Sequence, residues 1–305
     1  MYLPPRVHPI HAFAHRRVDV SQQVAVMAII NRTPDSFYDG GATFALDAAL
    51  DASLAAVQAG AAWLDIGGVP FAPGPELRWQ EEADRVVPVI RSIREQTDAI
   101  ISADTFQPQV AEAAIAAGAD VINDTTGISN PDLARVVADA GVHLVITHSL
   151  AKPRTVYPRP DYADVVQDVA GFLQRKVELA RSLGIDEGKL IIDPGHDLNK
   201  NTRHTLEVTR RLDEIAALGL PVLAAVSNKD FIGETLDQPK SERLSGSLSA
   251  AVICLMNGAR ILRMHNIPEA VSAARLFEST AGWREPAYLR HNMSDVNEPA
   301  RLPGR

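Results

Sequence analysis

The chain has 305 residues and a formal net charge of −8 at pH 7. That acidic balance leaves no large basic surface, which argues against bulk binding of nucleic acid or acidic membranes. No apolar run approaches the roughly 18–20 residues needed to span a bilayer, and the first residues lack the apolar core of a signal peptide. We therefore expect a cytoplasmic protein. Its one cysteine, Cys254, lies in an apolar helical run typical of a buried structural thiol.

Short β-branched runs alternate with alanine-rich helical stretches along the chain. This alternation indicates successive βα units and a parallel sheet. The sequence predicts eight strands, at 24–31, 62–68, 99–105, 120–125, 143–149, 189–195, 221–227 and 259–265. It predicts helices near 46–59, 79–96, 107–117, 131–140, 162–184, 203–218, 243–257 and 267–281.

Eight repeats predict a single (β/α)8 TIM barrel over residues 24–282. We expect a flexible N-terminal arm at 1–23 and a C-terminal tail at 283–305. A doubly wound open sheet is the alternative, and the lack of a G-x-G-x-x-G motif after the first strand counts against it. Several helices end at a glycine, which tolerates the left-handed conformation that closes a helix. These glycines are Gly60, Gly118, Gly141, Gly184, Gly219 and Gly258.

Polar residues gather at or just beyond the carboxyl ends of the predicted strands. In a barrel all these ends face one mouth, so the side chains are expected to converge on one site. The alternative is that each aspartate or asparagine starts a turn or caps the next helix. Nearly one such residue per strand favours a site. The residues are Asn31, Asp65, Asp104, Asn123, Asp124, His148, Asp193, Ser227 and His265.

Seven segments together carry a resemblance to a known family. They are NRTPDSFYDGG (31–41), LDIGG (64–68), ISADT (101–105), GADVINDTTG (118–127), IIDPG (191–195), VSNKDFIG (226–233) and GARILRMH (258–265). In order and spacing they resemble the dihydropteroate synthase family over about residues 24–282. The resemblance implies a transferase of folate biosynthesis. Such an enzyme joins 6-hydroxymethyl-7,8-dihydropterin diphosphate to p-aminobenzoate and releases diphosphate with the help of Mg²⁺.

The resemblance assigns the pterin to Asp104, Asn123 and Asp193, with Lys229 reaching the pterin carbonyl. Asp193 is expected to take the 2-amino and N3 edge of the ring. The chemistry agrees, because a pterin edge presents N–H donors and a carbonyl that carboxylates, amides and an ammonium group can pair. For Asp193 a helix-capping role is disfavoured, because Pro194 and Gly195 follow it.

The resemblance places the departing diphosphate on the first and eighth strands. Asn31 is the Mg²⁺-linked residue, and Arg263 and His265 hold the diphosphate. The implied catalytic set is therefore Asn31, Lys229, Arg263 and His265, since positive charge must meet the charge of the leaving group. A structural ion pair is the plain alternative for Arg263. The resemblance also implies a homodimer through the outer helices of the last repeats, where 250–259 is unusually apolar.

Three loops depart from the family pattern on the side expected to hold aminobenzoate. The pattern G-G-E-S-T-R-P-G reads GGVPFAPG at 67–74, D-P-G-x-G-F reads DPGHDL at 193–198, and S-R-K-S reads SNKD at 227–230. Two arginines are lost and two aspartates gained, so we expect poor binding of an anionic acceptor. Neutral variation of surface loops is the alternative. The altered residues are Val69, Pro70, Phe71, Ala72, Asp197, Leu198, Asn228 and Asp230.

Dihydropteroate synthesis is the best single activity, and three alternatives stay open. One is a diverged paralogue that binds the pterin but uses aminobenzoate poorly, uses another acceptor or uses none. Another is a folate-dependent methyltransferase of the related pterin-binding barrels, against which the loop from Asn31 to Ser36 counts. The last is a binding or regulatory protein without activity. The sequence assigns no role to His196, Asp197 and His204, whose spacing matches no standard zinc site.

Overall fold

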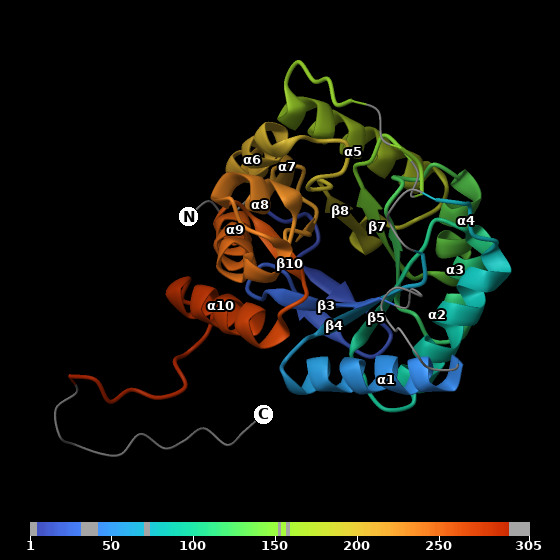
Figure 1. The fold of residues 1–305 in the computed structure, drawn as a ribbon, viewed down its shortest axis with the longest axis horizontal. Helices are drawn as coiled ribbons and strands as arrows, with labels where there is room; N and C mark the ends of the chain where they lie inside the picture. The colour runs from blue at the N-terminus through green and yellow to red at the C-terminus, as the bar shows by residue number, and fades with distance from the viewer. Residues whose placement is uncertain (1–4, 32–41, 70–73, 152–153, 157–158, 293–305) are drawn as a thin grey trace.

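The computed structural model describes residues 5–31, 42–69, 74–151, 154–156 and 159–292. Its eight long-range strands are all parallel and close into a barrel in the order β10-β3-β4-β5-β6-β7-β8-β9, with helices around it (Figure 1). The predicted TIM barrel is confirmed. The strands are β3 (Ala25–Asn31), β4 (Trp63–Gly67), β5 (Ile100–Asp104), β6 (Val121–Asp124), β7 (His143–Thr147), β8 (Leu190–Asp193), β9 (Val222–Ala224) and β10 (Ala259–Met264).

Every predicted helix has a counterpart on the outside of the barrel. The helix predicted at 203–218 is divided in two at Arg211. The sequence did not predict α8 (Asp230–Leu236) or the 3₁₀ turns η2 (Glu187–Lys189) and η3 (Lys240–Glu242). The other helices are α1 (Ala42–Gln58), α2 (Trp79–Arg94), α3 (Pro108–Ala116), α4 (Pro131–Ala140), α5 (Val165–Ser182), α6 (Thr202–Arg210), α7 (Leu212–Ala216), α9 (Leu244–Met256) and α10 (Ile267–Thr280).

The glycines predicted to close helices adopt the left-handed conformation. All six have positive φ, between 64° and 111°. Gly141 is the clearest case, since it caps the C-terminus of α4 at φ 64° and its N–H donates to Ala138 O. Glycine adopts this conformation without the steric cost that a Cβ brings. At these six positions the chain therefore turns sharply from a helix toward the next strand.

The N-terminal segment differs from the flexible arm that we expected. Residues 10–19 form an antiparallel hairpin of β1 (Ile10–Ala12) and β2 (Arg17–Asp19). Phe13, Val18 and Val20 are buried against the amino ends of the barrel strands, where Met27 and Trp63 fill the interior. The physical reason is the open apolar end of the barrel, which the hairpin covers. In the sequence, the alternation of the apolar residues Val18 and Val20 with polar ones was the feature that could have predicted this strand.

A second apolar cluster lies between the strands and the surrounding helices and includes Cys254, whose thiol is free and fully buried as predicted. With the amino ends of the strands covered by the hairpin, the polar strand ends face the opposite side of the barrel. Among the described helices, none carries an apolar stretch long enough to cross a bilayer.

Helices α9 and α10 pack against each other (Figure 1). Both leave apolar side chains exposed to solvent. Ile253 and Met256 are each 46% exposed on α9, and Leu276 is 71% exposed on α10. We propose that this surface forms a homodimer, because exposed apolar groups of this kind mark association sites. Sedimentation velocity at micromolar concentration should show a dimer that Ile253→Asp with Met256→Asp converts to a monomer.

The matched control for this experiment is Leu150→Asp, which places the same charge on an exposed leucine (52% exposed) of the β7–α5 loop and should leave the dimer intact. Sedimentation of the unmodified chain as a monomer would reject the dimer. Equal dissociation by Leu150→Asp would reject this particular surface.

Candidate active site at the mouth of the barrel

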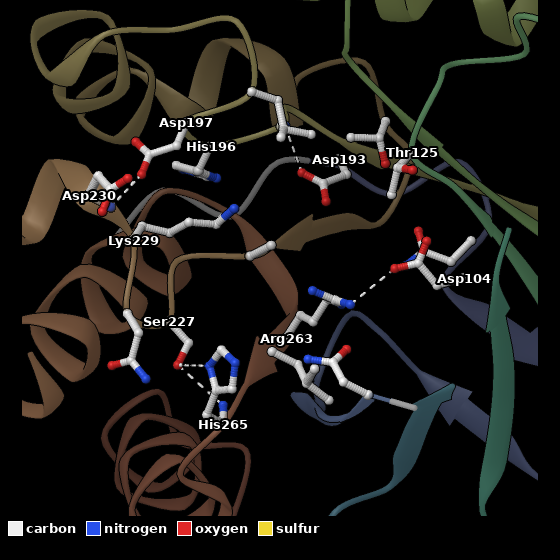
Figure 2. A pocket seen from close by; sticks show the side chains of 18 of the residues that line it. Asp104, Thr125, Asp193, His196, Asp197, Ser227, Lys229, Asp230, Arg263 and His265 are labelled. Atoms are coloured by element: carbon white, nitrogen blue, oxygen red, sulfur yellow. Dashed lines mark hydrogen bonds and ion pairs between the residues drawn. The ribbon is translucent and has the colours of Figure 1, made fainter. Parts of the chain in front are cut away.

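A cavity of about 610 Å³ opens at the carboxyl ends of the strands, within the size range of small-molecule sites. Figure 2 shows Asp104, Asp193, Lys229 and Arg263 arranged around one space. The structure therefore brings together residues that are far apart in the sequence. Six of the nine strand-end residues line the cavity, namely Asn31, Asp104, Asn123, Asp193, Ser227 and His265, and so do Lys229 and Arg263, which the family resemblance assigned. Asp65, Asp124 and His148 do not line it.

Arg263, near the end of β10, forms ion pairs with carboxylates of two neighbouring strands. Its Nε lies 2.7 Å from Asp65 Oδ2 on β4, and its Nη2 lies 3.2 Å from Asp104 Oδ2 on β5. Asp65 is fully buried and also accepts hydrogen bonds from Asn123 Nδ2 at 3.2 Å and from the Ser102 hydroxyl. Burial and the charge of Asp65 raise the pKa of Asp104. The single guanidinium group of Arg263 thus forms ion pairs with two carboxylates.

Two buried oxygen atoms of the cavity wall have no hydrogen-bond partner within the described ranges. They are Asn123 Oδ1 and Thr147 Oγ1. Because Asn123 donates through Nδ2 to Asp65, its Oδ1 is left as an acceptor. Buried polar atoms without partners are uncommon in folded proteins, so these atoms indicate where a bound molecule supplies the missing partner.

Asp193 ends β8 and is 5% exposed at the cavity wall. Its Oδ1 accepts a hydrogen bond of 2.7 Å from the N–H of Gly195. Burial raises the pKa of Asp193 to about 6. Gly195 has φ 67°, and a Cβ at this position would lie 2.2 Å from the carbonyl oxygen of His148. The glycine therefore lets the loop turn tightly beneath the carboxylate.

The side chain of Lys200 makes hydrogen bonds within the same loop, a feature that the sequence analysis did not predict. Its Nζ lies 2.8 Å from His148 Nδ1 and donates to Gly195 O and Leu198 O, each at 3.0 Å. The side chain is buried, and burial lowers the pKa of Lys200 to about 7. A lysine in a polar loop is usually solvated, so only the contacts reveal this role.

Lys229 extends beside His196 and Asp197 of the β8 loop, and His265 lies next to Ser227 (Figure 2). Lys229 precedes α8, and its Nζ makes no hydrogen bond within the described part of the chain. Burial lowers the pKa of Lys229, while the neighbouring Asp197 carboxylate acts in the opposite direction. His265 Nδ1 lies 2.9 Å from Ser227 Oγ. Burial, assisted by the charge of Arg263, lowers the pKa of His265 to about 4, so the imidazole is neutral at pH 7.

The two aspartates that replace family residues have protein partners. Asp197 Oδ2 accepts a hydrogen bond of 2.7 Å from the N–H of Asp230 and one of 3.3 Å from that of Phe231, at the start of α8. Asp230 forms an ion pair of 2.9 Å with Arg243. Their negative charges are therefore partly offset, because helix N-termini and guanidinium groups stabilise carboxylates. This pairing lowers the repulsion that the two carboxylates would exert on an anionic acceptor.

The remaining altered positions fall into two groups. Val69, Leu198 and Asn228 line the cavity, as do Asp197 and Asp230. Pro70, Phe71 and Ala72 lie outside the described residues.

Two unassigned histidines lie in separate surroundings. His196 is fully buried, and its Nε2 lies 3.9 Å from Cys254 Sγ. Burial lowers the pKa of His196 to about 3. His204, on α6, packs its ring edge-on against Tyr162 at a centroid distance of 5.2 Å. Each of these histidines therefore has its own packing partner, and Asp197 is held by α8 as described above.

This barrel and its polar mouth place the chain in a known class: it belongs to the pterin binding enzyme family, which it matches over residues 27–265. Inactive dihydropteroate synthase 2 of Mycobacterium leprae is 42% identical over 267 residues, which cover 86% of this chain and 92% of that protein. Dihydropteroate synthase of Escherichia coli K12 is 38% identical over 261 residues, covering 85% and 93%.

Among solved structures, dihydropteroate synthase of Xanthomonas albilineans with 4-aminobenzoic acid is similar to this chain at a TM-score of 0.84 and 36% identity. The similarity covers 90% of this chain and 99% of that one. The chain is thus a homologue of the dihydropteroate synthases. Its relatives include proteins named dihydropteroate synthase and proteins named inactive dihydropteroate synthase 2.

The buried ion pair of Arg263 predicts a large loss of stability when the arginine is removed. In Arg263→Met the fully buried Asp65 keeps its carboxylate without the guanidinium, and breaking a buried pair in this way costs about 3–5 kcal/mol. Urea unfolding should show this loss. The control is Arg78→Met, which breaks the exposed pair with Glu81 and should cost about 1 kcal/mol or less. Equal losses in the two variants would refute the prediction.

Proposed function

We propose that this protein binds 6-hydroxymethyl-7,8-dihydropterin diphosphate in the cytoplasm and that its condensation with p-aminobenzoate is weak or absent. The observation that carries the proposal is the unequal state of the two halves of the cavity. The residues expected to bind the pterin, Asp104, Asn123, Asp193 and Lys229, all line the cavity. The acceptor half is rebuilt around Asp197 and the start of α8.

The pterin ring has a complementary partner for each polar edge. The Asp193 carboxylate takes the 2-amino group and N3–H, and Lys229 donates to the ring carbonyl. Asn123 Oδ1, buried and without a partner in the described chain, accepts from a further N–H of the ring. Leaving such groups unpaired is costly, so a ligand that pairs them is favoured over one that does not.

The diphosphate extends toward Asn31, Arg263 and His265. Mg²⁺ fits here as an ion held by few protein oxygens, because it retains waters and is bound largely through the substrate phosphates. The donor set agrees, since Asn31 offers one amide oxygen at the mouth and lies beside Gly67, opposite Asp104. When bound, the ion would neutralise charge on the diphosphate. Arg263 orients the phosphate oxygens, and the neutral His265 donates one hydrogen bond.

In the reaction, the amine of the acceptor forms a bond to the pterin methylene carbon while the bond from that carbon to the diphosphate oxygen breaks. The amine then loses a proton to solvent. The protein's part is to hold the ring and leaving group in line and to bind the acceptor. This last task depends on the altered loops, and the name of the M. leprae relative agrees with an impaired reaction.

Dihydropteroate synthesis at an ordinary rate is the second candidate. It is favoured by the two acidic replacements being paired within the protein, which lowers the repulsion of an anionic acceptor. The 38% identity with the E. coli enzyme supports it as well.

Pterin affinity should depend on pH through Asp193. The ionised carboxylate accepts the two N–H groups, and its pKa is raised to about 6, so binding should be full near pH 7.5 and fall as pH drops through 6. Below that value the loss approaches tenfold per pH unit. Calorimetry with 6-hydroxymethylpterin should show this profile. Asp193→Asn should weaken binding by about 1–3 kcal/mol and flatten the profile.

The matched control is Asp139→Asn, which removes the same charge from the exposed outer side of α4. It should leave both the affinity and the pH profile unchanged. Pterin affinity that is equal in Asp193→Asn and the unmodified chain would remove Asp193 from the site.

Turnover should be slow and limited by the acceptor. With pterin diphosphate, Mg²⁺ and p-aminobenzoate, diphosphate release should lie well below about 1 s⁻¹, the low end of ordinary enzymes. Ala72→Arg, which restores the arginine of the family pattern, should raise the rate by about tenfold if one charge-assisted contact returns. Ala72→Gln, similar in length but uncharged, should not. A rate near 1 s⁻¹ in the unmodified protein would favour the second candidate.

A further inference from the structure

The cations that were assigned to the diphosphate supply little net positive charge. Arg263 is paired with the carboxylates of Asp65 and Asp104. His265 is neutral at pH 7 because its pKa lies near 4. Lys229 is deeper in the cavity and lies beside the Asp193 and Asp197 carboxylates, whose charges act on it. A diphosphate carries several negative charges, so its binding calls for a cation that is not already offset.

Lys240 is such a cation. It belongs to the turn η3, lines the cavity and is exposed. Within the described ranges its ammonium group has no hydrogen bond or ion pair. It lies near His265, since its charge contributes to lowering the pKa of that imidazole. An exposed lysine without a partner usually points freely into solvent, but this one borders the same cavity as Arg263.

The turn that carries Lys240 is fixed to the loop that carries Lys229. Arg243 makes this connection: its Nε donates to Gln238 O at 3.1 Å, and its Nη1 donates to Asn228 O at 3.1 Å and to Lys229 O at 3.2 Å. The same guanidinium also pairs with Asp230. Lys240 is therefore presented at the rim by a held backbone, which reduces the entropy lost when its side chain binds an anion.

We infer that Lys240 is an anion-binding residue that contacts the diphosphate group at the rim of the cavity, beside His265 and Arg263. The inference rests on the proposed function, because it assumes that the pterin ring occupies the deeper wall near Asp193. Lys240 then acts on the charged part of the substrate and leaves the ring unaffected. In this arrangement the turn η3 supplies positive charge from the seventh βα connection, between β9 and β10.

Calorimetry with three probes tests this assignment: inorganic diphosphate, 6-hydroxymethylpterin and the pterin diphosphate. Lys240→Gln should weaken the binding of inorganic diphosphate and of pterin diphosphate by about tenfold, the effect of one charge-assisted contact. It should leave the binding of 6-hydroxymethylpterin unchanged. Lys240→Arg keeps the charge and should restore most of the affinity. Raising the salt concentration should narrow the difference between the unmodified protein and Lys240→Gln.

Lys189→Gln is the matched control, because it removes the same charge from η2, which precedes β8 at the opposite end of the barrel. Diphosphate affinity that is unchanged in Lys240→Gln, or lowered equally by Lys189→Gln, would overturn the assignment. So would an unmodified protein that binds the pterin but not inorganic diphosphate, and in that case the pterin site would stand. If diphosphate binds through Lys240 while 6-hydroxymethylpterin does not bind, the proposed function fails and the anion site remains.

Discussion

The ion pairs of Arg263 organise the mouth of the barrel. A fully buried carboxylate at Asp65 is tolerated only with a charged partner and further hydrogen bonds, and Arg263, Ser102 and Asn123 supply them. The Trp63 indole donates to Ser102 and continues this network toward the closed end of the barrel. Because Asn123 is committed through its Nδ2, its Oδ1 is left for a ligand. The same pairing that stabilises β4, β5 and β10 thus also sets the acceptor pattern of the cavity.

The loop after β8 shows a second constraint, in which one segment serves both halves of the cavity. Gly195 and Lys200 fix the loop beneath Asp193 through hydrogen bonds of 2.7–3.0 Å. Two residues after Gly195, Asp197 crosses to the start of α8 and binds its N–H groups. Asp193 and the altered residue Asp197 are therefore joined both through the chain and through hydrogen bonds, so a change in the β8 loop affects the start of α8.

The altered loops after β8 and β9 are connected to each other by hydrogen bonds and an ion pair. Asp197 accepts a hydrogen bond from the backbone N–H of Asp230, and the Asp230 carboxylate forms an ion pair with Arg243. Both acidic side chains therefore have partners within the protein. An acceptor that enters this region must compete with these contacts or adapt to them, and specificity follows from that difference in free energy. Under the proposed function, these contacts account for a barrel that binds a pterin and uses aminobenzoate poorly.

The sequence by itself determined the barrel, its strands and outer helices, and the seven side chains that meet at the mouth. The barrel and most of these residues follow from local patterns, because parallel strands end on one side and strand-end polar residues converge there. Lys229 and Arg263 came from the family resemblance. Only the tertiary structure decided that residues 10–19 cover the opposite end, that Asp197 binds α8 and that Lys240 borders the cavity. Asp197 and Asp230 are 33 residues apart, and a contact over such a distance leaves no periodic trace in the sequence. It arises from where the folded barrel places two loops side by side.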